Sequence, residues 1–257
     1  MKSRNHSLGA RTIVAAYDLV LVALALALTA FFYTMAGFAG GSLFTALLLL
    51  TGLAAGQAAL AGLIFNVFSA TSSLMRWKIH FEKEFLWFLA GSVPAAFLAG
   101  LLVLPDTLLR IIMGLVVAVG GFSLMLATYS LRTVKVNPMM KIMIGALIGF
   151  VAGLTGIGGG VYLAPILILA GMAKPKATAA TTTVFILLNS ASGIAARIPR
   201  LGILISNPLV AVAIPVVLVA AQFGSYIGSR RLTQTNVRRV IGTVLISVGL
   251  YIVATSI

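Results

Sequence analysis

The sequence contains no cysteine, two histidines and four acidic residues among its 257 positions. The absence of cysteine excludes disulfide bonds, thiol catalysis and zinc sites built on thiolates. So few histidines and acids also leave little for a metal centre or for general acid–base catalysis. The composition therefore argues against an enzyme, and we expect neither a cofactor nor a metal site.

Charge is also scarce: charged residues make up 9% of the chain, whereas hydrophobic residues make up 61%. A soluble domain averages about 25% charged and about 45–50% apolar residues. The apolar runs are continuous rather than alternating, which favours spanning helices over a closed barrel. The sequence thus predicts an all-α polytopic membrane protein in a lipid bilayer.

The net charge of +14 would suggest nucleic acid in a soluble protein. In a membrane protein, Lys and Arg gather in loops and set the orientation, so we expect no nucleic-acid partner. The first apolar run, Thr12–Met35, is too long for a cleavable signal peptide and lacks a clear small-residue cleavage site. We predict that it is the first spanning helix.

Long and short apolar segments follow one another along the chain. They are Thr12–Met35, Gly40–Ala55, Ala58–Met75, Phe85–Leu104, Leu108–Leu131, Ile142–Thr155, Val161–Ala173, Thr178–Ala196, Ile203–Ile227 and Val240–Ile257. The chain looks duplicated, because an offset of 119 residues places the Gly40-Gly41 pair on the Gly159-Gly160 pair. Internal repeats are typical of secondary transporters. We predict one transmembrane domain over 1–257, with homologous halves at about 12–131 and 140–257.

Each half has four long segments and one short one. If the short segments enter the membrane and return, the chain crosses eight times and the repeats are parallel. If they cross, there are ten crossings and the repeats are inverted. Lys and Arg distribute almost equally well under both arrangements, so the positive-inside rule does not choose. We adopt eight crossings, about four per half, with broken, re-entrant half-helices at the glycine-rich turns.

The stretch Gly156-Ile-Gly-Gly-Gly, followed by Pro165, interrupts the apolar pattern. Glycine costs a helix about 1 kcal/mol and proline about 3 relative to alanine. Unwound backbone is tolerated at membrane depth only where it lines protein or a watery cavity. A short helix after the run would point its N-terminus at that cavity, and helix N-termini bind anions. Close helix packing is the alternative role for these glycines. The predicted substrate-binding residues here are Gly156, Gly158, Gly159, Gly160, Val161 and Pro165, with Gly40 and Gly41 in the first-half copy.

Polar side chains inside apolar segments extend this prediction. Thr181 and Thr182 could donate to an oxyanion, although back-bonding to the preceding turn is equally favoured. Asn66 and Asn189 should face the bundle or a cavity, and structural bonding between helices is their alternative role. Asp18 is the acid lying well inside an apolar segment, which suggests proton coupling. Pairing at the membrane interface is the alternative for Asp18.

The segment GFVAGLTGIGGGVYLAPILILAGMAKPKATAATTTV resembles the sulfite exporter TauE/SafE family. The resemblance rests on the glycine run, Pro165, Gly171, Ala177 and the Thr181-Thr182 pair. It implies a transporter of the bacterial cytoplasmic (inner) membrane with two related halves, exporting sulfite or a related small organosulfur or carboxylate anion. The first half departs from the pattern: Ala46 stands where the second half has Pro165. A site carried mostly by the second half, or a site with an altered substrate, fits this departure.

These observations predict a secondary transporter whose partner is a small anionic substrate. A membrane scaffold whose glycines serve packing alone, or a channel, is the alternative. The sequence leaves open which anion moves, in which direction and with which coupling ion. It also leaves open whether the chain forms a homo-oligomer.

Overall fold

The computed structural model describes residues 2–126, 136–202, 207–230 and 234–256, with side chains described from Leu19 onward except at 234–237. This part of the chain is helical and contains no strand. The main helices are α1 (Lys2–Met35), α2 (Gly41–Leu50), α3 (Ala55–Trp77), α4 (Leu86–Leu101), α5 (Asp106–Leu126), α6 (Pro138–Thr155), α7 (Gly160–Leu169), α8 (Pro175–Ala195), α10 (Pro208–Arg230) and α11 (Gln234–Ala254). Three short 3-10 turns, Lys78–His80, Lys83–Phe85 and Ile198–Arg200, join some of them. Six of the helical stretches described are long and apolar enough to cross a membrane, so the prediction of an all-α membrane protein is confirmed.

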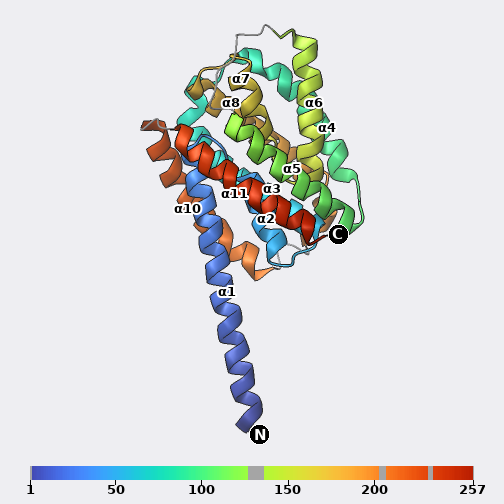
Figure 1. Cartoon of the computed structure of the whole chain (residues 1–257), viewed down its shortest axis with the longest axis vertical. Helices are drawn as coiled ribbons and strands as arrows, with labels where there is room; N and C mark the ends of the chain where they lie inside the picture. The colour runs from blue at the N-terminus through green and yellow to red at the C-terminus, as the bar shows by residue number, and fades with distance from the viewer. Residues whose placement is uncertain (1, 127–135, 203–206, 231–233, 257) are drawn as a thin grey trace.

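The long helices pack in pairs (Figure 1). α3 lies along α8, and these two helices are 67% buried over their apolar windows, against 33–44% for the other candidate spans. The remaining pairs are α1 with α10, α4 with α6, and α5 with α11. α3 and α8 therefore form the centre of the bundle, and the outer pairs surround them.

Glycines bring the outer pairs into backbone contact. A Cβ at Gly145, Gly149 or Gly153 of α6 would collide with a carbonyl oxygen of α4. Gly224 and Gly228 of α10 contact carbonyl oxygens of α1 in the same way. Such close approach is how helices associate in a membrane, where apolar burial gives little driving force. These glycines have a packing role, and they are distinct from those of the turns described below.

The two ends of the bundle are marked by polar contacts. At one end, where α4 meets α5, Arg110 donates to the carbonyl oxygen of Leu53 at 2.6 Å, and Asp106 accepts from the N–H of Ala55 at 2.6 Å. α2 therefore ends at this α4–α5 end. At the other end, where α3 meets α4, Lys141 near the start of α6 pairs with Glu84 at 2.9 Å.

The short helix α7 ends at the α3–α4 end. A cavity of about 510 Å³ lies there, between the loop that follows α7 and the connection from α3 to α4. α2 and α7 thus run toward opposite ends of the bundle, although each follows a glycine turn. The glycine turns themselves lie between the two ends.

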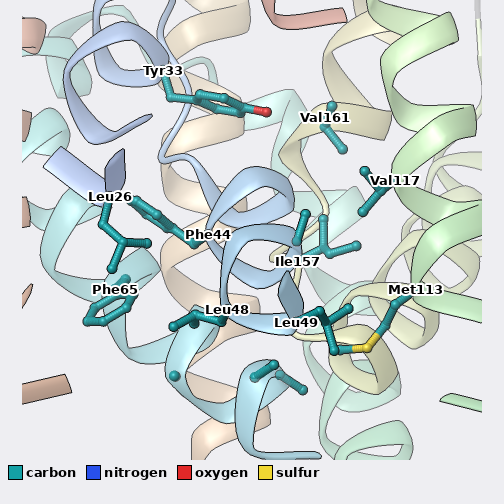
Figure 2. Packing of buried hydrophobic residues seen from close by; sticks show 14 of the residues in the cluster. Leu26, Tyr33, Phe44, Leu48, Leu49, Phe65, Met113, Val117, Ile157 and Val161 are labelled. Carbon is teal, nitrogen blue, oxygen red and sulfur yellow. The ribbon is translucent and has the colours of Figure 1, made fainter. Parts of the chain in front are cut away.

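Both short helices contribute to the main hydrophobic cluster (Figure 2). Phe44 and Leu49 of α2 lie in it, together with Val161 of α7, Ile157 of the second glycine turn and Met113 of α5. α2 and α7 are therefore core elements, so their positions are fixed by packing on several sides.

Candidate functional site

Glycine supplies the left-handed backbone that begins both short helices. The φ angle is +100° at Gly40 and +76°, +79° and +82° at Gly156, Gly158 and Gly159. Residues with a Cβ rarely adopt these values. The interruption that the glycine run predicts in the sequence is therefore present as a break between α6 and α7.

The N-termini of α2 and α7 are uncapped by side chains. α2 follows Gly40 and α7 follows Gly159, and neither glycine can supply a capping oxygen. The first N–H groups of a helix have no partners within it. Each N-terminus also carries about half a positive charge. Both helix starts therefore present N–H donors and partial positive charge within the bundle.

The two turns touch each other at Asn66 of α3. A Cβ at Gly41 would collide with the carbonyl oxygen of Ile157 and with the side chain of Asn66. Asn66 Nδ2 donates to the carbonyl oxygen of Gly156 at 3.4 Å, and Thr45 Oγ1 reaches the same oxygen at 3.4 Å. Backbone from both halves of the chain thus meets around one buried amide.

Two polar atoms next to this contact lack hydrogen-bond partners among the described residues. They are Asn66 Oδ1 and Ser190 Oγ, and both side chains are fully buried. A Cβ at Gly158 would lie 2.8 Å from Asn66 Nδ2 and 3.2 Å from Ser190 Oγ, so both side chains face the turn. A buried polar group without a partner costs about 1–3 kcal/mol. We call Gly41, Asn66, Gly156, Gly158 and Ser190 the glycine-turn site.

Thr182 lies beside the start of α7, because a Cβ at Gly160 would be 3.6 Å from Thr182 Cβ. Its hydroxyl is 2.8 Å from the carbonyl oxygen of Thr178 and 3.0 Å from that of Gly37. The back-bonding that the sequence left open is present, with an added contact to the turn before α2. The single hydroxyl proton of Thr182 is engaged by carbonyl oxygens.

Three other predicted residues are buried around the site rather than in it. Thr181 Oγ1 has no partner within the described structure. Asn189 Nδ2 donates to the carbonyl oxygen of Phe185 in its own helix at 2.8 Å. Pro165 lies within α7, several residues beyond the glycine turn. The side chain of Asp18 lies outside the described residues, so proton coupling through it stays a prediction.

Sequence reasoning missed Arg197, which follows α8 and is 3% exposed. Its Nη2 donates to the carbonyl oxygens of Gly153 and Leu154 at 2.7 and 3.2 Å, and its Nη1 to that of Gly193 at 3.2 Å. Burial, together with the charge of Arg200, lowers the pKa of Arg197 to about 10, so the guanidinium stays charged at neutral pH. Arg197 therefore caps the negative C-terminal end of α6, just before the glycine turn.

The sequence held little signal for Arg197 and Ser190, the two residues that it did not predict. In the structure Gly100 leaves space for Arg197, because a Cβ at that position would lie 3.0 Å from its Nη1, but a glycine near a helix end does not by itself indicate a buried arginine. Ser190 follows Asn189 directly in an apolar helix, and only the structure shows which of the two faces the turn. Spacing alone could not decide between these neighbours.

The sequence profile described as "Sulfite exporter TauE/SafE" matches residues 21–252. The chain belongs to this family. A TauE/SafE protein is a membrane transporter, so the resemblance drawn from the glycine run is confirmed. The chain is also 31% identical over 244 residues to the probable membrane transporter protein y4hK of Sinorhizobium fredii, covering 89% of this chain and 96% of the relative. No solved structure matches this TauE/SafE chain.

Proposed function

We propose that this TauE/SafE protein is a secondary transporter that exports a small oxyanion, such as sulfite or an organosulfonate, across the bacterial inner membrane. We propose that the anion binds at the glycine-turn site. The observation that carries the proposal is the meeting of two uncapped helix N-termini beside the buried amide of Asn66 and the unpartnered hydroxyl of Ser190. The backbone N–H groups, the second N–H of Asn66 Nδ2 and the Ser190 hydroxyl can all donate to an oxyanion.

The charge at the site supports an anion over a cation. The acidic side chains that the structure describes, Glu82, Glu84 and Asp106, lie at the ends of the bundle, where Glu84 pairs with Lys141 and Asp106 with Arg110. The partial charges of two helix N-termini act in a low-dielectric interior, where they are felt more strongly than in water. Asn66 and Ser190 are fully buried, so the protein must change conformation to load or release the anion.

We further propose that the halves are inverted repeats of five elements, α1–α5 and α6–α11, in which the short helices α2 and α7, each with its glycine turn, complete a crossing. The helix pairing supports this arrangement, because α1 with α10 and α4 with α6 become equivalent pairs. α2 and α7 run to opposite ends, as inverted repeats require. Parallel repeats with eight crossings fit these contacts less well. In alternating access, a substrate site between the repeats would then open first to one side of the membrane and then to the other.

Orientation follows from the distribution of basic residues. The α3–α4 end holds most of the described Lys and Arg side chains, namely Arg76, Lys78, Lys83, Lys141, Lys174, Lys176 and Arg230. The α4–α5 end holds Arg110 and Arg200, whereas Arg197 is buried against the C-terminal end of α6. The positive-inside rule then places the α3–α4 end in the cytoplasm.

The test is thermal stability of the purified protein with sodium salts of sulfite, sulfate, thiosulfate, sulfoacetate, taurine, acetate and chloride. A ligand at 100 times its dissociation constant stabilises a protein by about 2.7 kcal/mol, which is readily seen as a shift in melting temperature. We expect a shift with at least one sulfur oxyanion. Asn66→Asp should abolish it, because a carboxylate of the same shape repels the anion.

Two controls sharpen this test. Ser92→Ala also removes a buried hydroxyl without a described partner, but at the contact between α4 and α6, so it should keep the shift. Flux of radiolabelled sulfite into liposomes should saturate with concentration. A cooperatively melting protein that responds to none of these anions would refute the proposal and favour a scaffold. Flux that never saturates would favour a channel.

A further inference from the structure

Four polar side chains recur along one face of α3. They are Asn66, Ser69, Ser73 and Trp77, at intervals of three or four residues. At 100° per residue they fall within a sector of about 80°. All four are fully buried. We call this set the α3 polar stripe.

Each member of the stripe carries a polar atom without a hydrogen-bond partner in the described part of the chain. These atoms are Asn66 Oδ1, Ser69 Oγ, Ser73 Oγ and Trp77 Nε1. Buried polar groups are normally paired, and a row of exceptions on one helix face calls for a specific cause. Four unrelated defects in packing would not be expected to place their unpaired atoms on the same face of one helix over three turns.

The stripe faces α8 at both of its ends. Asn66 shares the surroundings of Gly158 with Ser190 of α8. Trp77 packs with Ala179 and Ala180 of α8. The antiparallel α8 therefore covers the stripe along its length. It also contributes Thr181 Oγ1, a further hydroxyl without a described partner, one residue from Ala180.

The stripe joins two features of the fold. Its inner end, Asn66, belongs to the glycine-turn site. Its outer end, Trp77, packs with Phe81, which lines the cavity of about 510 Å³ at the α3–α4 end. Lys174 and Lys176 line the same cavity, with His80 and Glu82.

From this placement we propose that the α3 polar stripe is the path along which the anion moves between the glycine-turn site and the basic cavity. This proposal rests on the proposed function. Hydroxyl and indole N–H groups donate to an anion without holding it by a full charge. Conduction needs several such weak sites, since a tight one would trap the ion. The lysines at the mouth raise the local concentration of anions.

The chain has no native cysteine, so single cysteines can report on the path. Ser69→Cys and Ser73→Cys place thiols on it. Ser72→Cys places one on another buried face of α3, and Thr71→Cys on an exposed face. Each variant is reconstituted into phospholipid vesicles and exposed to a membrane-impermeant methanethiosulfonate that carries a sulfonate group. Unmodified thiols are then counted by maleimide labelling after unfolding, and a sample that was not exposed to the methanethiosulfonate gives the total.

We expect the thiols at positions 69 and 73 to react at least about tenfold faster than that at position 72, because only a hydrated thiolate is attacked. Sulfoacetate should slow both reactions. The double variant Lys174→Gln, Lys176→Gln should lower initial sulfite flux about tenfold at low ionic strength, with the difference shrinking as salt screens the charges.

The outcomes separate the path from the proposed function. If wild-type protein transports sulfite but the thiols at 69 and 73 react no faster than that at 72, the path is wrong and the function stands. If they react fast but no anion moves or shifts the melting temperature, the function is wrong and the stripe is only a hydrated crevice. If the double lysine variant has the same initial sulfite flux as wild type at every salt concentration, the cavity does not attract the anion and its proposed role is wrong.

Discussion

A single arginine shows how one residue can hold a broken helix in place. Arg197 is buried, and its three described hydrogen bonds all go to carbonyl oxygens. No carboxylate pairs with it among the residues that the structure describes. A helix that stops inside a bundle leaves its last carbonyls without partners, and a cation there satisfies them and opposes the dipole. Arg197 thus stabilises the break that the glycines permit.

Arg197→Gln should therefore destabilise the protein by about 3 kcal/mol, since it leaves buried carbonyl oxygens of α6 unpaired. Arg197→Lys should fall between this variant and wild type, because an ammonium cannot reproduce the planar fork of donors. Thermal unfolding in detergent measures both effects. Arg200→Gln is the control: Arg200 is exposed, and its loss should change stability by less than about 0.5 kcal/mol. Equal effects at the two arginines would contradict the capping role.

The residues of the site differ in how far the sequence could predict them. The glycine turns were foreseeable, because consecutive glycines in an apolar run have few structural uses at membrane depth. Asn66 was foreseeable as a costly amide in lipid. Arg197 was not, because an arginine just after a spanning helix is usually a topology signal at the membrane surface.

At the scale of elements, glycines in this chain serve two different physical purposes. Those of the turns adopt positive φ, whereas those of α6 and α10 allow backbones to touch. The sequence predicts short segments at Gly40–Ala55 and Val161–Ala173, and the structure has α2 at Gly41–Leu50 and α7 at Gly160–Leu169. It could not predict that α4 pairs with α6, since lipid-facing and helix-facing apolar residues look alike in one sequence.

The packing role of the glycines in α6 predicts that two glycine-to-alanine substitutions have different effects on the stability of the protein. Gly149→Ala should destabilise the protein by about 1–3 kcal/mol, because the added methyl group collides with the carbonyl oxygen of Ser92. Gly56→Ala, in the first turn of α3, meets nothing within 4 Å and should be neutral or slightly stabilising. Melting temperatures of the two variants, measured side by side, give the comparison. A neutral Gly149→Ala would show that α4 and α6 can separate without cost.

At the scale of the whole molecule, the distribution of basic side chains between the two ends of the bundle predicts which end faces the cytoplasm. α11 runs antiparallel to α5, since Gly114 near the start of α5 contacts Gly249, and Gly121 contacts Gly242. The C-terminal end of α11 therefore lies at the α4–α5 end, away from most of the described basic side chains. The sequence alone did not decide which side of the membrane the C-terminus faces, because arrangements with eight and with ten crossings satisfied the positive-inside rule almost equally.

Reporters fused to the C-terminus check this orientation. An alkaline phosphatase, which is active only outside the cytoplasm, should be active there, and a green fluorescent protein should be dark. The same reporters placed in the α3–α4 connection should give the reverse pattern. A fluorescent green fluorescent protein at the C-terminus would show that the proposed orientation is wrong and that the basic cavity lies on the external side.

The pairing of α1 with α10 and of α4 with α6 has a consequence for biogenesis. When the first half has left the ribosome, α1 and α4 are in the membrane without α10 and α6, and the faces that receive the glycines of those helices have no partner. The nascent chain must therefore wait as a loosely associated set of helices until the second half arrives, since the contacts that complete the bundle are distant in sequence. During that interval it depends on the insertion machinery and on the lipid to keep those faces from pairing with other chains.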